Sequence, residues 1–275
     1  MMRLLFALAA AMLLSACAPP GLEKHEGYVV DTRHPAWGAR PRVKVLVIHY
    51  TAEDFPSSLA TLTDRNVSAH YLIPARPHQL GNQPMVLRLV PETQLAWHAG
   101  ISFWRGATRI NDTSIGIELE NQGYKRTAGG LIWYPFTPQQ MGALMPLTRD
   151  IVKRYNILPQ DVVGHSDVAP QRKQDPGPLF PWHWLAEQGV GAWPDADRVR
   201  FFLACRAPDQ LTDPANLLTL LARYGYEVTP GMTQKQQQKV IAAFQMHFRP
   251  ADYRGLADAE SEAIAEALLE KYGTG

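Results

Sequence analysis

The first half of the chain carries short apolar runs with the period of β-strands. Residues 43–51 are apolar and β-branched with few breaks, which predicts a strand buried in the middle of a sheet. Residues 114–120 alternate between apolar side chains and small or acidic ones, which predicts a strand with one apolar face and an opposite face that carries Glu118. Residues 68–73 and 85–90 are two further strand candidates. Together these runs predict a β-sheet.

The second half carries the longer period of helices. A helix is predicted from Pro138 to just before Leu158, with apolar residues at helical spacing between them. Three more helices are predicted near the C-terminus, where Asp213, Thr233 and Asp258 are typical capping residues. Strands mixed with helices predict an α/β fold with a mixed central sheet flanked by helices, and the last stretch predicts a small all-α C-terminal domain.

The N-terminus has the pattern of an export signal. Residues 4–14 form an apolar run that is too short to cross a bilayer but suits a secretory signal peptide. The run ends in Leu14-Ser15-Ala16-Cys17, which resembles the lipobox of bacterial lipoproteins, where the cysteine is lipidated and becomes the first mature residue. We therefore expect a lipoprotein signal peptide at 1–16 and a lipidated N-terminus and tether at 17–39. An ordinary signal peptide with an unrelated cysteine is the alternative.

The residue after Cys17 bears on location. Ala18 stands where an aspartate would resemble a signal for retention in the inner membrane. We therefore expect the protein to be anchored in the outer membrane through the lipid on Cys17, facing the periplasm. The other cysteine, Cys205, then has no partner for an intramolecular disulfide, and we expect it to be a small buried hydrophobe.

The charge balance of the chain argues against one class of partner. The chain has 27 basic and 26 acidic residues, for a formal net charge of +1, and no basic cluster. Nucleic acid is therefore not expected as a partner. No protein partner is predicted either, and we expect a monomer.

The candidate chemistry lies at the ends of strands. His49 ends the first apolar run, His165 follows another short apolar segment, and Asp175 comes ten residues later. Two imidazoles and one carboxylate would leave a zinc ion one open position for water, as catalytic zinc sites do. Glu118 is suited to act as a general base on that water. Spacing alone makes this a weak prediction, because a lone histidine is more often simply hydrogen-bonded or solvated.

Three segments resemble the amidase-2 family of zinc amidases, which is related to T7 lysozyme and to peptidoglycan-recognition proteins. They occur in order and cover most of residues 40–185. The segments are Val47-Ile48-His49-Tyr50-Thr51; Ala96-Trp97-His98-Ala99-Gly100 followed by Asn111-Asp112-Thr113-Ser114-Ile115-Gly116-Ile117-Glu118-Leu119-Glu120; and Gly164-His165-Ser166-Asp167-Val168-Ala169-Pro170 followed by Arg172-Lys173-Gln174-Asp175-Pro176-Gly177-Pro178.

The resemblance implies Zn²⁺ held by His49, His165 and Asp175. It also implies Glu118 as the general base and Lys173 beside the scissile carbonyl, where the lysine would stabilise the oxyanion together with the metal. The implied reaction is hydrolysis of the amide bond between the lactyl group of N-acetylmuramic acid and L-alanine of the stem peptide. Its substrates would be peptidoglycan and the muropeptides derived from it, in cell-wall degradation, turnover or recycling.

The resemblance also suggests a domain division. Residues 40–190 would be the zinc amidase catalytic domain and residues 196–275 a helical peptidoglycan-binding-like domain. With the lipobox, the whole chain is similar to outer-membrane lipoprotein amidases of this family. Because every motif residue precedes Ala192, a chain ending there is expected to fold and to cleave soluble muropeptides. The alternative for the C-terminal helices is that they only cover the catalytic domain.

Several assignments stay open. Glu120 competes with Glu118 from the same strand face. His98 and Trp97 are weaker candidates for substrate contact, and for His98 a hydrogen-bonded core position is equally supported. Two rival functions are disfavoured: the complete candidate ligand set argues against a peptidoglycan receptor without catalysis, and the lack of a His-Glu-x-x-His motif argues against a zinc peptidase of that type.

Overall fold

The structure is a computed structural model that describes residues 20–273. Contacts divide the chain between Arg40 and Pro41 into two compact units. The first unit contains an antiparallel hairpin of β1 (Leu22–His25) and β2 (Tyr28–Asp31), within the segment predicted as a tether. The predicted signal peptide and Cys17 lie outside the described residues.

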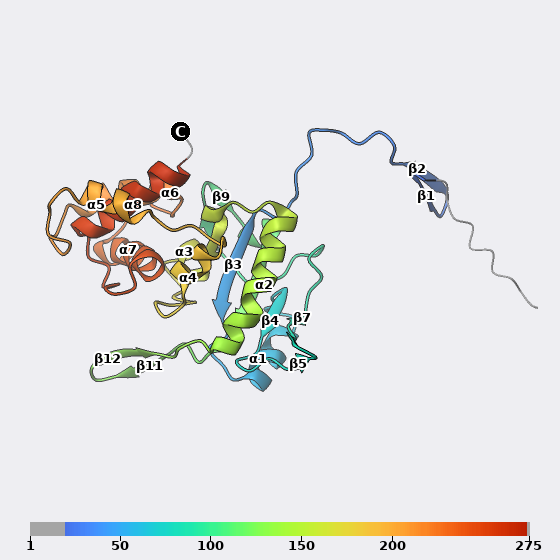
Figure 1. The fold of residues 1–275 in the computed structure, drawn as a ribbon, viewed down its shortest axis with the longest axis horizontal. Coiled ribbons are helices and arrows are strands. Elements are labelled where there is room, and N and C mark those ends of the chain that lie inside the picture. Colours follow the sequence, from blue (N-terminus) through green and yellow to red (C-terminus); the bar gives the residue numbers. More distant parts are fainter. Residues whose placement is uncertain (1–19, 274–275) are drawn as a thin grey trace, which may run out of the picture. The chain divides into compact units, whose positions relative to one another are not determined.

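The second unit is built on the predicted mixed sheet of five strands (Figure 1). The strand order is β13-β3-β10-β4-β7, in which β7 is antiparallel to β4 and all other neighbours are parallel. Three of the four predicted strands are close to their expected positions, whereas the one expected at 85–90 is only two residues long. The strands are β3 (Val45–Tyr50), β4 (Tyr71–Ile73), β7 (Leu87–Arg88), β10 (Ser114–Leu119) and β13 (Val162–Gly164).

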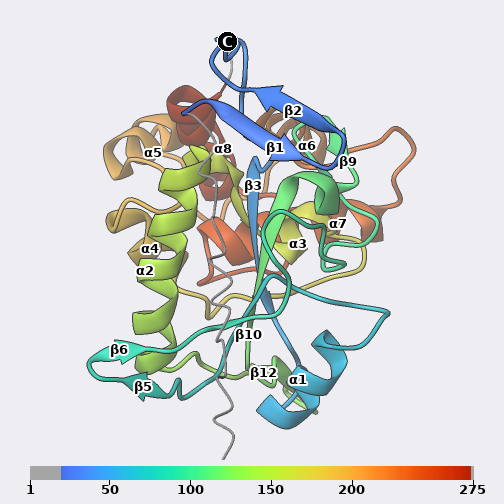
Figure 2. The same ribbon diagram turned by 90° about the vertical axis from the view of Figure 1, so that its right-hand side faces the viewer.

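Strand β3 divides its side chains between two cores, as alternation along a strand requires. Leu46 and Ile48 belong to a core that includes Met141 and Leu144 of helix α2 (Pro138–Tyr155). Figure 2 shows α2 along the sheet. The helix begins as predicted, because the side chain of Thr137 accepts a hydrogen bond from the backbone of Gln140.

The other face of β3 packs against the C-terminal helices. Val45 and Val47 lie in one continuous core with Trp104, Tyr226 and Phe244. The three predicted helices are present with their expected caps, and a fourth, not predicted, precedes them. The four are α5 (Ala196–Leu203), α6 (Pro214–Tyr224), α7 (Gln234–Phe248) and α8 (Ala259–Tyr272). The C-terminal helices therefore share a core with the sheet, and the division at about residue 190 stays a prediction.

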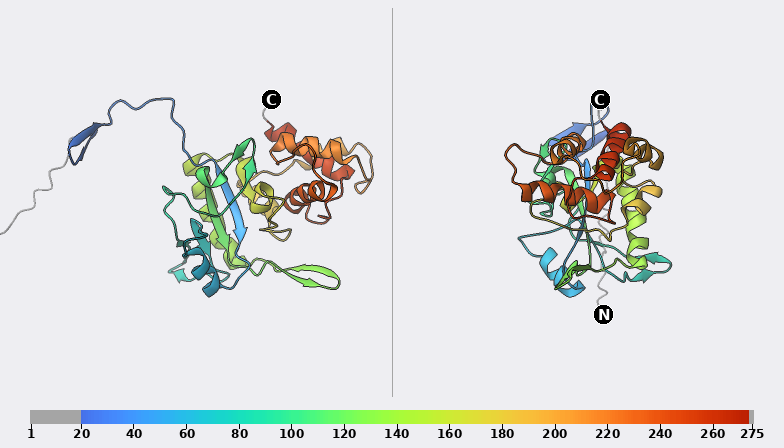
Figure 3. Two further views of the ribbon diagram at one scale, coloured as in Figure 1. Left: turned by 180° about the vertical axis from the view of Figure 1, so that it is seen from behind. Right: turned by 90° about the vertical axis from the view of Figure 1, so that its left-hand side faces the viewer.

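One feature differs from the sequence expectation, and a second was not predicted. Cys205 is exposed rather than buried, because it lies in the turn after α5 instead of on a packed helix face. A hairpin of β11 (Tyr124–Thr127) and β12 (Gly130–Trp133) follows β10 and projects on the side of the C-terminal helices (Figure 3). Each of its strands has only four residues, too few to give a clear period.

The remaining elements are short connections around the sheet. Among the helices that the structure describes, none is both long and apolar enough to cross a membrane. The short elements are α1 (Phe55–Leu62), β5 (Gln79–Leu80), β6 (Gln83–Pro84), β8 (Phe103–Trp104), β9 (Ala107–Thr108), α3 (His165–Val168), α4 (Trp182–Glu187) and the 3₁₀ helices Ile110–Thr113 and Pro159–Asp161.

Candidate active site

The candidate site forms where the carboxyl ends of β3, β10 and β13 meet. His49 and Glu118 are register partners on the adjacent parallel strands β3 and β10, so their side chains lie next to each other on the same face. His165 is the first residue of α3, directly after β13. Asp175 comes from the following loop, whose backbone carbonyl at this residue accepts a hydrogen bond from Ser166.

The three candidate ligands converge on one point. The Nδ1 atoms of His49 and His165 are 3.0 Å apart, and each lies 3.1 Å from Oδ2 of Asp175. These separations are within about 0.5 Å of those between the ligands of a tetrahedral zinc ion. Three atoms with lone pairs directed at one another are stable only around a proton or a metal cation, so this donor set fits zinc.

Hydrogen bonds behind the ligands fix the orientation of both rings. Nε2 of His165 lies 3.1 Å from the carbonyl oxygen of Ala99, to which only a protonated nitrogen can donate. This leaves the Nδ1 lone pair of the neutral ring free for a metal. Nε2 of His49 lies 3.0 Å from Nδ1 of His98, whose Nε2 lies 3.0 Å from Oγ of Ser114. Such outer hydrogen bonds select the tautomer of a metal-binding histidine.

His98 is therefore a buried neighbour of His49 and not a residue of the open cleft. The residue is 8% exposed, and its ring lies directly over Gly116, where an added Cβ would come within 2.5 Å of the ring. Glycine at this position of β10 makes room for the imidazole. Trp97 is 56% exposed but is not among the residues that line the cleft.

Burial and neighbouring charges set the protonation of the ligands. The pKa of His49 is lowered to about 4, chiefly by burial and also by the nearby His165, against the opposing effect of Asp175. Burial alone would raise the pKa of the Asp175 carboxyl, but the two histidines outweigh it and hold this pKa below its usual range. His49 is thus a neutral imidazole and Asp175 an ionised carboxylate, the forms that bind metal.

Glu118 in β10 and Glu120 just after it differ in their hydrogen bonds and in their distance from the candidate ligands. Oε1 of Glu118 lies 4.0 Å from Nδ1 of His49, and its buried Oε2 has no hydrogen-bond partner among residues 20–273. Burial, helped by the charge of Asp175, raises the pKa of Glu118 to about 8. Glu120 instead accepts a hydrogen bond of 2.6 Å from the backbone of Ala75, away from the three candidate ligands. Only Glu118 has a free carboxylate oxygen beside them.

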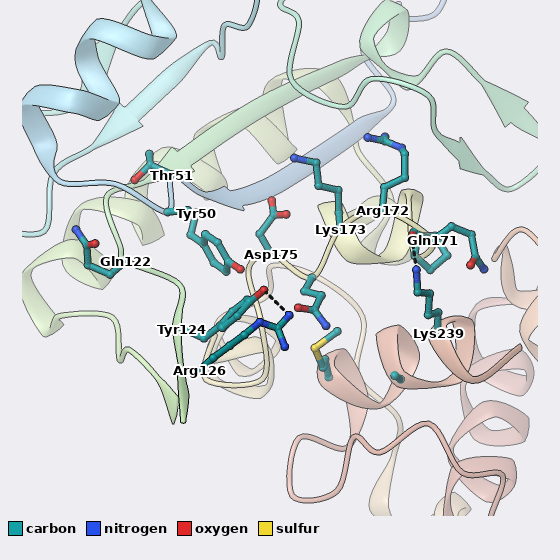
Figure 4. Close-up of a pocket in the computed structure, with 15 residues that line it drawn as sticks. Tyr50, Thr51, Gln122, Tyr124, Arg126, Gln171, Arg172, Lys173, Asp175 and Lys239 are labelled. Carbon is teal, nitrogen blue, oxygen red and sulfur yellow. Dashed lines mark hydrogen bonds between the residues drawn. The ribbon is translucent and has the colours of Figure 1, made fainter. Parts of the chain in front are cut away.

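An open cleft of about 740 Å³ leads to the site (Figure 4). Asp175 and Lys173 line it on one side, and the hairpin contributes Tyr124 and Arg126. Helix α7 contributes Lys239. Figure 4 shows Lys173 and Asp175 projecting from the same loop beside the end of β3. In the described part of the chain, no carboxylate lies within ion-pair distance of the Lys173 ammonium group.

Comparison with known proteins agrees with this geometry. Residues 39–178, half of the chain, match the sequence profile of the amidase-2 family, described as N-acetylmuramoyl-L-alanine amidase. The chain belongs to this family of N-acetylmuramoyl-L-alanine amidases. The family assignment confirms the expected enzyme class, and with it the resemblance found in the sequence.

Individual relatives support the assignment over the whole length. The N-acetylmuramoyl-L-alanine amidase AmiD of Escherichia coli is 63% identical over 274 residues, which are 99% of each chain. A structure of AmiD in complex with anhydro-N-acetylmuramic acid-L-Ala-D-gamma-Glu-L-Lys has a TM-score of 0.90 and 64% identity, over 93% of this chain and 99% of that one. AMPDH3 of Pseudomonas aeruginosa has a TM-score of 0.80 and 39% identity, over 91% and 98% of the two chains.

The sequence motifs contain the candidate ligands of this amidase but not all of the residues that line its cleft. Arg126 and Lys239 lie more than a hundred residues apart and belong to no motif. Arg126 is on the hairpin and Lys239 on α7, so only the tertiary contacts bring them to the same cleft. No signal in the sequence distinguishes them from other surface cations.

Proposed function

We propose that this amidase depends on zinc held by His49, His165 and Asp175. The observation that carries the proposal is the triangle of lone-pair donors with sides of 3.0–3.1 Å. The hydrogen bond from His165 to Ala99 supports it, because it leaves the opposite ring nitrogen free to bind a cation. We further propose that His98 positions His49 and does not contact substrate, while Trp97 stays a candidate for substrate contact.

Zinc, when bound, supplies Lewis-acid activation of water and of the amide carbonyl. Glu118 takes a proton from the attacking water and returns it to the nitrogen of the departing amine. Its unpartnered Oε2 and its place 4.0 Å from Nδ1 of His49 support this role, because the carboxylate can reach a water bound beside the candidate ligands. Lys173 stabilises the negative charge that develops on the carbonyl oxygen.

The proposed substrates are muropeptides and peptidoglycan. The bond cleaved joins the lactyl carboxyl group of N-acetylmuramic acid to L-alanine, and the products are the muramoyl carboxylic acid and the free stem peptide. The ligand of the related AmiD structure supports this substrate class. The corresponding process is cell-wall degradation, turnover or recycling. Among the C-terminal helices, α7 lines the cleft through Lys239, Ala242 and Met246, which supports the proposed role of these helices in binding peptidoglycan.

Release of stem peptide from a purified muropeptide tests the proposal. We expect one zinc ion per chain, loss of activity with a chelator and recovery on adding zinc. His49→Ala and His165→Ala should each lose metal and activity, because two remaining ligands hold zinc poorly. His183→Ala is the control, since His183 is on the surface with 60% of its side chain exposed. Full zinc occupancy in either ligand variant would contradict the assignment.

We also propose that Cys17 carries lipid and anchors the protein in the outer membrane, facing the periplasm. The support is the sequence Leu14-Ser15-Ala16-Cys17 after an apolar run. Cells that express the chain should incorporate labelled palmitate into it, and Cys17→Ala should abolish the label and release the protein from the outer-membrane fraction. An unlabelled wild-type protein would rule out the anchor.

A further inference from the structure

The cleft concentrates positive charge in a chain that is nearly neutral. Four cationic side chains line it, and among residues 20–273 the only carboxylate in its lining is Asp175, a candidate metal ligand. The formal net charge of the whole chain is only +1. The four cations are Arg126, Arg172, Lys173 and Lys239. A cleft with this excess favours a ligand that carries negative charge.

Two of these cations have donors to spare. The guanidinium of Arg126 lies 5.4 Å from the ring centre of Tyr124 and makes only a long contact of 3.4 Å with its hydroxyl. Lys239 donates to the carbonyl oxygen of Gln171 at 2.6 Å, which leaves two of its three protons free. Among residues 20–273 neither cation pairs with a carboxylate. Arg172 differs, because it is committed to the carbonyl oxygens of Ala99 and Ile101.

Both cations lie on elements, the hairpin and α7, that hydrogen bonds hold in place. The hairpin that carries Arg126 is fixed by Trp133, whose indole donates to the hydroxyl of Tyr253 at 2.8 Å. Helix α7, which carries Lys239, is fixed to α3 by a hydrogen bond of 2.7 Å between His247 and Asp167. Figure 4 shows the two side chains on different walls of the same cleft.

We propose that Arg126 and Lys239 form a subsite for carboxylates of the stem peptide. The inference rests on the proposed function, since it names which part of a muropeptide this end of the cleft binds. A glutamate linked through its γ-carboxyl group keeps its α-carboxylate free, and the peptide chain ends in another carboxylate. Both are anions of the kind that guanidinium and ammonium groups bind through charge-assisted hydrogen bonds.

Three substrates distinguish the two sources of carboxylate. They are muramyl-L-Ala-D-γ-Glu-L-Lys with both carboxylates free, the same compound with the glutamate α-carboxylate amidated, and the same compound with the C-terminus amidated. The wild-type enzyme should lose about three- to tenfold in kcat/KM on one of the amides, the range for a charged hydrogen bond that remains partly solvated. The amide that is cleaved more poorly identifies the carboxylate bound.

Arg126→Met and Lys239→Met test the residues. Each should lower kcat/KM for the free acid by about three- to tenfold, chiefly through KM, and should cleave the acid and the amide equally. Lys125→Met is the matched control for the hairpin, because alternation directs Lys125 away from the cleft. Lys235→Met is the control for α7, one turn earlier and outside the cleft lining. Both controls should keep the wild-type preference.

Two results would overturn the subsite: equal cleavage of all three substrates by the wild-type enzyme, or an unchanged preference in both Arg126→Met and Lys239→Met. Zinc content and thermal denaturation of the variants show that any change is not a loss of folding. If the wild-type enzyme releases stem peptide from none of the three, the proposed reaction itself fails, which is a different outcome from loss of selectivity alone.

Discussion

At the scale of single residues, two glutamates that share one sequence pattern lie in different surroundings. Glu118 and Glu120 belong to the same alternating pattern, yet only Glu118 lies beside His49 with a free carboxylate oxygen. The strand ends at Leu119, and the backbone of Ala75 then binds the carboxylate of Glu120. Gly116, two residues before Glu118, accommodates the ring of His98.

Glu118→Gln and Glu120→Gln should therefore behave differently. Glutamine in place of Glu118 has the same shape but cannot accept the proton of water, so kcat should fall by about 10²–10⁴-fold with little change in KM. Zinc content should stay at one ion per chain. Glu120→Gln keeps an oxygen for Ala75 and should cost about threefold or less. The assignment is reversed if Glu120→Gln is the inactive variant, and loss of zinc from Glu118→Gln would make the glutamate a support of the metal site.

At the scale of elements, one buried carboxylate joins α3 to the C-terminal helices. Asp167 accepts hydrogen bonds of 2.7 Å from the backbone of Gly164 and from His247, and one of 2.6 Å from the hydroxyl of Tyr226. The side chains of Asp167, His247 and Tyr226 are all buried. The ring of His247 also stacks on Trp182 at a centroid distance of 3.9 Å. The segment that begins at His165 is thus held by residues 59 and 80 positions away from Asp167.

His247→Leu should destabilise the protein because it removes one donor from a buried carboxylate. We expect the free energy of unfolding to fall by about 2–4 kcal/mol, the range for breaking a buried charged interaction from one side. Urea denaturation followed by tryptophan fluorescence measures it. His183→Leu is the control, because His183 also stacks on a tryptophan but lies on the surface. An unchanged unfolding midpoint in His247→Leu would mean that this contact contributes nothing to stability.

At the scale of the whole chain, the sheet is covered on both faces. Helix α2 covers one face, and the C-terminal helices cover the face from which His49 projects. Buried side chains such as Val240, Phe244 and Leu217 each contribute about 1.5–3 kcal/mol through burial. Several such losses exceed the total stability of an ordinary domain, which is about 5–15 kcal/mol.

A chain that ends at Ala192 should therefore fail to fold, contrary to the expectation from motif positions alone. It would expose Val47 and Trp104 and leave Asp167 without His247 and Tyr226. Circular dichroism on heating should show no cooperative transition. A chain that begins at Pro41 is the control, because it loses only the separate N-terminal unit and should fold and cleave muropeptides. A cooperative transition with full activity in the shortened chain would show that the shared core is dispensable.

The sequence by itself determined what depends on local interactions. The caps at Asp213, Thr233 and Asp258 were recognisable because each binds a backbone group within three residues. The buried strand that carries His49 was recognisable from its apolar run. The amidase family was recognisable because its motifs are short and ordered. The candidate metal ligands followed from the family, and the structure brings all three together.

Only the tertiary structure decided what depends on distant parts of the chain. It shows that Glu118, and not Glu120, lies beside His49, and that His98 lies against the Nε2 side of the His49 ring. It also places Arg126 and Lys239 in one cleft. It also merged the C-terminal helices with the sheet into one core. The physical reason is the same in each case. Burial, ion pairing and cleft shape depend on contacts between side chains that are far apart in the sequence, and a local sequence pattern carries no information about such contacts.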